Sequence, residues 1–152
     1  MNDDSEIKIG QVLWLNVRYQ TDIISIIKHP MLVVKTEKEY IEVIAIDKTA
    51  GKMHQLFHRY NYYIDCDNPK ESVIHEDSYA QLNTKLTIEN IEELKFARKT
   101  IKKLSIQKLD ELIYEYNNYQ SKYGVDEHRI VHMNSNEILS LNPDISKISV
   151  AK

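Results

Sequence analysis

MLVVKTEKEYIEVIAI, residues 31–46, is the most informative stretch of the chain for its fold. It opens with a nearly continuous apolar run over 31–35, which is typical of a strand buried on both faces. Residues 40–46 then alternate with a period of two, as a strand with two different faces does. The alternating sets are Ile41, Val43 and Ala45 against Tyr40, Glu42, Ile44 and Ile46. Lys38 and Glu39 between the two runs indicate a tight connection, so the sequence predicts a β-hairpin.

Shorter segments on either side of this hairpin also have strand character. Residues 11–18 (QVLWLNVR) place Val12, Trp14, Asn16 and Arg18 on one side and Leu13, Leu15 and Val17 on the other. Weaker strand candidates lie at 53–57, 62–65 and 73–75. Several short strands with short connections predict a small barrel or sandwich, which we expect over residues 7–87.

Residues 88–124 have the periodicity of helices. Apolar residues recur at spacings of three and four, first at Ile91, Leu94, Ala97 or Arg98, Ile101 and Leu104, then at Leu109, Leu112, Ile113, Tyr116 and Tyr119. Thr87 is a candidate N-cap for the first stretch, Ser105 opens the second, and Gly124 suits its C-terminal end. These signals predict two helices joined at Ser105, with one long helix over 88–122 as the alternative.

The last segment, residues 125–152, is polar and weakly periodic. We expect a short helix or strand over 130–141, a turn at Asn142 and Pro143, and otherwise an irregular tail. The whole chain is therefore predicted to be an α+β protein, mainly β with a helical C-terminus.

Composition bounds the class of protein. The chain has 152 residues with 42% hydrophobic and 28% charged side chains, which is ordinary for a globular domain. Cys66 is the sole cysteine, so no internal disulfide forms, and a reducing compartment is favoured. The acidic N-terminus has no apolar signal-peptide core, and no apolar run approaches the roughly 20 residues that span a bilayer. We expect a cytoplasmic protein without a membrane segment.

Charge is unevenly distributed along the chain. The formal net charge is -3, so nothing draws the whole molecule toward nucleic acid. Residues 95–103 (KFARKTIKK), in contrast, carry five basic residues and no acidic one. Any contact with RNA must therefore come from a local patch, although a run of this kind is more often a solvated face.

Four short motifs follow one another in an order that resembles the PemK/MazF family. The segments are GQVL at 10–13, HPMLVV at 29–34, VIAI at 43–46, and ESVIH at 71–75 leading through YAQLNTKL at 79–86. The resemblance covers about 80 residues and implies an SH3-like β-barrel. It also implies a homodimeric endoribonuclease that cleaves single-stranded RNA without a metal ion and is neutralised by a protein antitoxin.

The resemblance also suggests catalytic residues. In the family, an arginine before the proline of the second motif is central to catalysis, and a threonine or aspartate at the end of the VIAI-like strand is its partner. In this chain His29 precedes Pro30, and Asp47 and Lys48 follow the strand. The implied roles are base or acid for His29, orientation of His29 for Asp47, and phosphate binding for Lys48. Unlike arginine, histidine cannot bind a phosphate through two hydrogen bonds from a permanently charged group.

Aromatic and basic residues interleave over 54–63, a pattern that suits stacking on single-stranded bases. The candidate RNA contacts are Arg18, Thr49, His58, Arg59 and Tyr62. His54 and His58 have the spacing of a helical metal pair, but no glutamate stands between them as in H-E-x-x-H and their surroundings are strand-like. We therefore predict no metal site and no cofactor.

Each of these features has a structural reading as well. His29 can simply shape the entry to a buried strand, because a residue before proline is held extended. Residues 47–49 suit a turn, and the rings of 54–63 suit a half-buried strand pair. The alternatives to an endoribonuclease are therefore a catalytically inactive binding module on the same scaffold and a domain that contacts only proteins.

The two apolar stripes of 88–124 also bear on assembly. A barrel of about 80 residues has little outer surface on which to bury both, and exposed stripes of this size are rare in monomers. We therefore expect a homodimer, with helices that fold back within one chain as the competing account.

Overall fold

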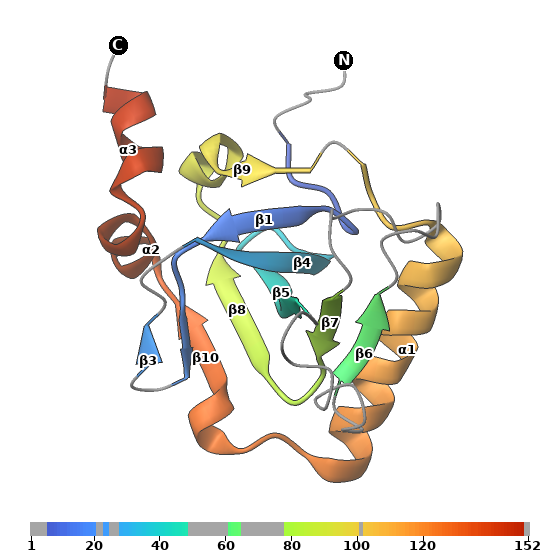
Figure 1. The fold of residues 1–152 in the computed structure, drawn as a ribbon. Coiled ribbons are helices and arrows are strands. Elements are labelled where there is room, and N and C mark those ends of the chain that lie inside the picture. The colour runs from blue at the N-terminus through green and yellow to red at the C-terminus, as the bar shows by residue number, and fades with distance from the viewer. Residues whose placement is uncertain are drawn as a thin grey trace.

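The predicted hairpin forms the centre of the structure, with β4 (His29–Thr36) antiparallel to β5 (Tyr40–Lys48). The computed structural model describes residues 6–20, 23–24, 28–48, 61–64, 78–100 and 102–150. In β4, positions 31–34 are all buried, as the continuous apolar run predicts. The hairpin prediction is therefore confirmed, and the rest of the sheet is built on its two sides (Figure 1).

The sheet has eight strands, in the order β10-β8-β5-β4-β1-β9, with β7 and β6 added beside the end of β5. The strands other than β4 and β5 are β1 (Val12–Leu15), β6 (Asn61–Ile64), β7 (Ser78–Gln81), β8 (Lys85–Glu89), β9 (Arg98–Lys99) and β10 (Ile130–Met133). All described pairs in it are antiparallel except β10 with β8. A separate pair is formed by β2 (Arg18–Gln20) and β3 (Ile23–Ile24).

The chain is thus a mixed α+β protein, as the sequence predicts. The described strands form an open sheet, because no ladder between them joins the edge strands β9 and β10. The described strands therefore do not form a closed barrel. The strand candidates at 53–57 and 73–75 lie outside the described residues, whereas the one at 62–65 corresponds to β6.

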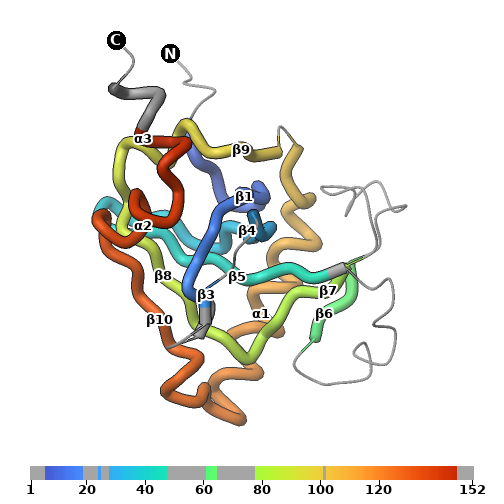
Figure 2. Tube along the Cα trace, turned by 60° about the vertical axis from the view of Figure 1, so that its left-hand side comes forward, coloured from blue at the N-terminus to red at the C-terminus, as the bar shows by residue number. Residues whose placement is uncertain are grey.

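Helices cover both faces of the sheet (Figures 1 and 2). They are α1 (Ile106–Tyr123), α2 (Ser135–Leu141), α3 (Pro143–Val150) and the 3-10 helices η2 (Glu92–Phe96) and η3 (Glu127–Arg129). The face covered by α1, here called the α1 face, has a core that includes Val12, Leu32, Ile44, Leu112 and Tyr116. The opposite face, here called the α2–α3 face, has a core that includes Leu13, Met31, Val43, Leu94, Met133, Ile138 and Ile145.

The second predicted helix is confirmed as α1. Ser105 is its N-cap, and its hydroxyl accepts a hydrogen bond from the Lys108 backbone N–H at 3.2 Å. Gly124 follows the last turn with φ +73°, a conformation that favours glycine. None of the described helices is long and apolar enough to cross a membrane.

The first predicted helix is wrong. Thr87, the expected N-cap, lies inside β8 and pairs with Glu42 on one side and His132 on the other. Beyond β8 the chain makes only the short η2, and Ala97 is already extended before β9 pairs with β1. The apolar spacing of three reflects this single 3-10 turn, which buries Leu94 and Ala97. Pairing on both sides of β8 therefore overrides the local helical pattern.

The irregular tail is also corrected by the structure. Residues 130–133 form β10, parallel to β8, and α2 and α3 follow without a loose stretch between them. Val131, Met133, Ile138 and Ile145 are each no more than 3% exposed. Weak periodicity concealed this segment because its elements are short, from four to eight residues each.

Candidate functional site

His29 and Asp47 lie at the same end of the β4–β5 hairpin. Met31 and Ala45 are the last Cα partners of the described ladder, and His29 and Asp47 each lie two residues beyond them along their strands. Residues two apart in a strand share a face, so His29 lies on the face of Met31 and Asp47 on the face of Ala45. The shared face is the α2–α3 face, because Met31 and Ala45 belong to its core. Both side chains are only partly buried, so this end of the sheet remains accessible.

Tyr79 completes this group. It is the Cα partner of Asp47 in the β5–β7 pair, and its hydroxyl donates to Asp47 Oδ2 at 3.3 Å. The Tyr79 residue is 4% exposed, so the hydroxyl is held in a fixed position. A buried donor of this kind can orient the carboxylate. The sequence does not reveal this contact, because residues 79 and 47 meet only through a ladder between distant segments.

The aromatic strand β6 divides its side chains between the two faces. Tyr63 pairs with Tyr79, so it lies on the same face as Asp47, and it is 44% exposed. Tyr62, the predicted RNA contact, points to the other face and packs partly buried against the core beneath α1. Tyr63 is therefore better placed than Tyr62 to contact a ligand beside Asp47. The period of two in a strand gives the physical reason.

Arg18, a predicted RNA contact, is held by the C-terminal helices. Its guanidinium meets Glu137 of α2 through two contacts, Nε to Oε2 at 2.6 Å and Nη2 to Oε1 at 3.1 Å. Nη2 also donates to the His132 carbonyl oxygen at 3.2 Å. A partly buried bidentate pair of this kind fixes geometry. Arg18 therefore anchors α2 to the strands.

The remaining predicted site residues are only partly described. Lys48 is the last residue of β5 and the Cα partner of Ser78, which places its backbone next to Asp47. Thr49, His58 and Arg59 lie outside the described residues. Within the described ranges, no group of three or more His, Cys, Asp or Glu side chains is arranged to hold a metal ion.

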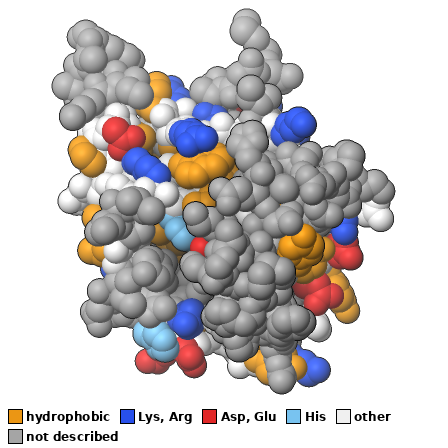
Figure 3. Space-filling view, in the orientation of Figure 1, with side chains coloured by type: hydrophobic (Ala, Val, Ile, Leu, Met, Phe, Trp, Pro, Cys, Tyr) orange, Lys and Arg blue, Asp and Glu red, His pale blue; other side chains and the backbone are white. Residues whose placement is uncertain are grey.

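The basic run 95–103 lies along one edge of the sheet. Lys95 belongs to η2, Arg98 and Lys99 form β9, and the chain then continues beside the start of β1. Figure 3 shows Lys and Arg side chains next to hydrophobic atoms over β1 and β9. The described residues of this run therefore lie at the β9 edge of the sheet and not on a solvated helix face.

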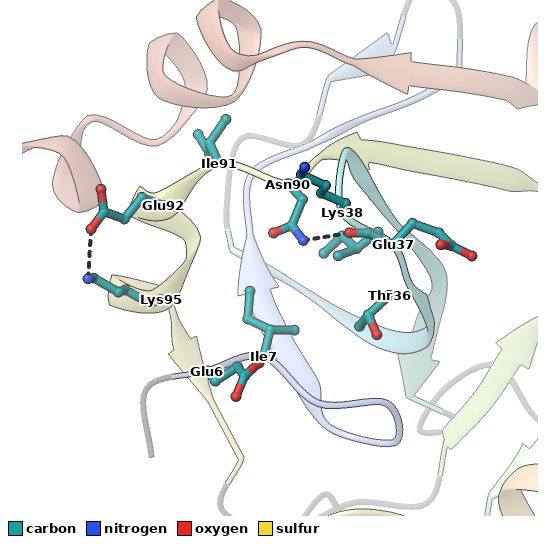
Figure 4. A pocket seen from close by; sticks show the side chains of 10 residues that line it. Glu6, Ile7, Thr36, Glu37, Lys38, Asn90, Ile91, Glu92 and Lys95 are labelled. Carbon is teal, nitrogen blue, oxygen red and sulfur yellow. Dashed lines mark hydrogen bonds and ion pairs between the residues drawn. The ribbon is translucent and has the colours of Figure 1, made fainter. Parts of the chain in front are cut away.

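A cleft of about 720 Å³ lies at the far end of the hairpin from His29 and Asp47 (Figure 4). It is lined by Glu6, Ile7, Thr36, Glu37, Lys38, Ile41, Asn90, Ile91, Glu92 and Lys95. Lys95 pairs with Glu92 at 3.0 Å, and Asn90 Nδ2 donates to the Glu37 carbonyl oxygen at 2.8 Å. Three glutamates against two lysines leave this cleft with excess negative charge, which opposes phosphate binding. We therefore do not assign a nucleic-acid site to it.

Comparison with known proteins gives no relative. No protein family, no curated protein and no solved structure matches this chain.

Proposed function

We propose that this chain is a PemK/MazF-like endoribonuclease that cleaves single-stranded RNA without a metal ion. The observation that carries the proposal is the hydrogen bond from Tyr79 to Asp47, at the end of the β4–β5 hairpin where His29 also lies. The four ordered motifs of the sequence point to His29 and Asp47, and each lies two residues beyond the last Cα pair of the same ladder.

The proposed reaction uses the RNA 2′-hydroxyl as nucleophile. Neutral His29 takes the 2′-hydroxyl proton while the 2′-oxygen attacks phosphorus, and the bond from phosphorus to the 5′-oxygen breaks. The leaving 5′-oxygen takes a proton from a water molecule, and protonated His29 then gives its proton back to the resulting hydroxide, which leaves a 2′,3′-cyclic phosphate and a 5′-hydroxyl. Asp47, held by Tyr79, orients the imidazole and stabilises its charged form. Lys48 supplies positive charge to the phosphorane.

The SH3-like barrel belongs to the same proposal. Its support is a contact near the open edge of the sheet, where β2 continues from β1 toward β10. The Arg18 backbone N–H donates to Met133 Sδ at 3.4 Å, and the Arg18 guanidinium reaches the His132 carbonyl oxygen. These contacts join β2, which follows β1 in the chain, to β10 at one end of the strand order. We infer an incomplete barrel in which β2 lies against β10 without a ladder between them.

The homodimer and the antitoxin partner rest on the resemblance alone. The two apolar stripes that suggested a dimer are satisfied within one chain, since Leu94, Ala97, Leu104, Leu112 and Tyr116 are all buried. Sedimentation equilibrium tests the dimer directly, because one chain has a mass of 17.9 kDa. A mass near this value at all concentrations would contradict it.

The test of activity is RNA cleavage in the presence of EDTA. A long single-stranded RNA should be cut by the purified protein, and His29→Ala should slow cutting by at least about 100-fold, the usual contribution of a general base or acid. His128→Ala is the matched control, because His128 is an exposed histidine of η3. Unchanged cleavage by His29→Ala would remove this residue from the mechanism.

A non-catalytic RNA-binding module is the second candidate, and the histidine in place of arginine before Pro30 favours it. RNA that stays intact at high protein concentration but is retained in filter binding would select this function. If the protein neither cleaves nor binds RNA, the function that remains is a domain that contacts only proteins.

A further inference from the structure

Three cations mark the edge of the sheet beside β1, and together they are here called the basic edge: Arg98, Lys102 and Lys103. All three side chains are exposed. Arg98 is the Cα partner of Trp14, and its Cζ atom lies 4.3 Å from the centroid of the indole ring. This is a cation–π contact, in which the ring holds the planar guanidinium in place. One flat face of Arg98 is thus fixed against Trp14 while the residue remains exposed.

The backbone that carries the basic edge is fixed by partly buried polar contacts. The Thr100 backbone N–H donates to the Val12 carbonyl oxygen at 3.0 Å. The Thr100 hydroxyl accepts from the Val12 N–H at 3.0 Å and donates to the Lys102 carbonyl oxygen at 2.8 Å. Gln11, only 5% exposed, donates through Nε2 to the Thr100 carbonyl oxygen at 2.8 Å. The cations are therefore presented from a constrained segment.

The charge of the basic edge is not neutralised by the described part of the chain. Within those residues, none of the three cations forms an ion pair with a carboxylate, whereas nearby Lys95 pairs with Glu92 at 3.0 Å. An array of cations beside an aromatic ring suits a polyanion that also carries flat rings. Single-stranded nucleic acid has both properties, because its bases stack on aromatic side chains and on guanidinium planes.

We propose that the basic edge and Trp14 form a binding site for single-stranded RNA. In this site a base stacks on the outer face of the Arg98 guanidinium, and Lys102 and Lys103 neutralise neighbouring phosphates. The inference rests on the proposed function, since it names a second RNA contact for the same protein. Trp14 is the Cα partner of Pro30, the residue after His29. The stacking site on Arg98 of β9 is therefore two strands from His29 of β4, about 9.6 Å between backbones, and Trp14 and His29 lie on alternate faces of the sheet.

The experiment uses Trp14 as its own reporter, because it is the sole tryptophan of the chain. The full-length protein is titrated with a 2′-O-methyl oligouridine, which lacks the nucleophile needed for cleavage. We expect the oligonucleotide to change the Trp14 fluorescence. Arg98→Gln should weaken binding about tenfold, the effect of removing one stacked base. Arg98→Lys keeps the charge, so it should abolish the fluorescence change but retain the salt dependence of binding.

Two further variants separate charge from position. Lys102→Gln combined with Lys103→Gln should reduce the slope of log K against log salt by about 0.7 for each phosphate that the protein no longer neutralises. Lys122→Gln is the matched control, since Lys122 Nζ lies 5.5 Å from the centroid of the Tyr123 ring on α1, away from this edge. It should leave both binding and fluorescence unchanged.

The outcomes distinguish this inference from the proposed function. RNA binding by anisotropy of a labelled oligonucleotide, with Trp14 fluorescence unchanged and Arg98→Gln unaffected, would overturn the basic edge and leave the endoribonuclease proposal standing. A Trp14 response without cleavage of the matching all-ribose RNA would support the basic edge and remove the endoribonuclease. Equal affinity for inorganic polyphosphate, tighter binding of polyglutamate, or no RNA binding at all would each overturn the inference.

Discussion

The two faces of the sheet are covered in different ways. One continuous helix of 18 residues, α1, covers the α1 face and buries Leu112 and Tyr116. The α2–α3 face is covered by pieces from separate parts of the chain, because Leu94 comes from η2, Ile138 from α2 and Ile145 from α3. The first face is covered by one continuous helix, and the second by several short segments from separate parts of the chain.

Each face of the sheet also has its own buried hydrogen bonds. On the α1 face, the Tyr116 hydroxyl donates to Glu42 Oε2 at 2.6 Å. On the other face, fully buried Asn142 joins α2 to the end of β1: Nδ2 donates to the Asn16 carbonyl oxygen at 2.9 Å, and Oδ1 accepts from the Asn16 N–H at 2.7 Å. Asn142 Oδ1 also accepts from Lys28 Nζ at 2.8 Å. On the α2–α3 face, the single buried amide of Asn142 thus links α2, the end of β1 and Lys28.

Deletion of β10, α2 and α3 should have the largest effect on the stability of the protein. Ending the chain after Arg129 deletes four core side chains of the α2–α3 face, namely Val131, Met133, Ile138 and Ile145. Each contributes about 1.5–3 kcal/mol on burial, and the sum approaches the roughly 5–15 kcal/mol that holds a domain together. We expect no cooperative urea unfolding by circular dichroism. Ile130→Ser, at a position on β10 that is 51% exposed, is the control and should fold. Cooperative unfolding of the shortened chain would make the segment dispensable.

A single cavity on the α1 face should lower the free energy of unfolding by a smaller amount. Leu112 is fully buried beneath α1, so Leu112→Ala should lower the free energy of unfolding by about 3–4 kcal/mol. Urea denaturation measures this decrease. The matched control is Ile106→Ala on the same helix, where the side chain is 79% exposed and the change should stay within about 0.5 kcal/mol. A decrease below about 1 kcal/mol at Leu112 would mean that α1 packs loosely.

Loss of the Asn142 hydrogen bonds on the α2–α3 face should have the next largest effect on the free energy of unfolding. Asn142→Ala leaves the Asn16 N–H and carbonyl oxygen without their partners, so we expect a decrease of about 2–3 kcal/mol in the free energy of unfolding. Asn136→Ala, at an exposed position of α2, is the control and should be nearly neutral. Equal stability of the two variants would show that packing alone positions α2.

The smallest effect concerns the Tyr116 hydroxyl, whose removal in Tyr116→Phe should cost about 1–2 kcal/mol near neutral pH. Burial, and then the hydrogen bond to Glu42, raise the pKa of Tyr116 above its usual value. The folded state therefore holds this proton more tightly than the unfolded state. Its contribution is complete below about pH 10 and falls as the pH rises above that value.

Urea denaturation from pH 7 to 11 measures this dependence. The stability difference between the wild type and Tyr116→Phe should narrow at the alkaline end, whereas Tyr114→Phe, at a position 66% exposed, should match the wild type throughout. A difference that stays constant up to pH 11 would contradict the raised pKa.

The residues of the candidate site were predictable one by one, but their arrangement was not. His29 and Asp47 stand out through their place in the motifs, and the hairpin between them is a local feature. Tyr79 and Tyr63 join them only through the β5–β7 and β6–β7 ladders, whose partners are separated by long stretches of sequence. The engagement of Arg18 by Glu137 depends on α2 and was equally hidden.

The β4–β5 hairpin, and helix α1 with its ends at Ser105 and Gly124, follow from local patterns in the sequence. Both are set by neighbours a few residues apart, through alternation, apolar spacing and capping. Three other features depend on tertiary contacts: the strand over 85–89, the 3-10 turn and edge strand over 92–99, and the parallel strand over 130–133. In those segments apolar spacing fits a helix and a strand equally well. The available backbone partners, supplied by β5, β8 and β1, select the strand.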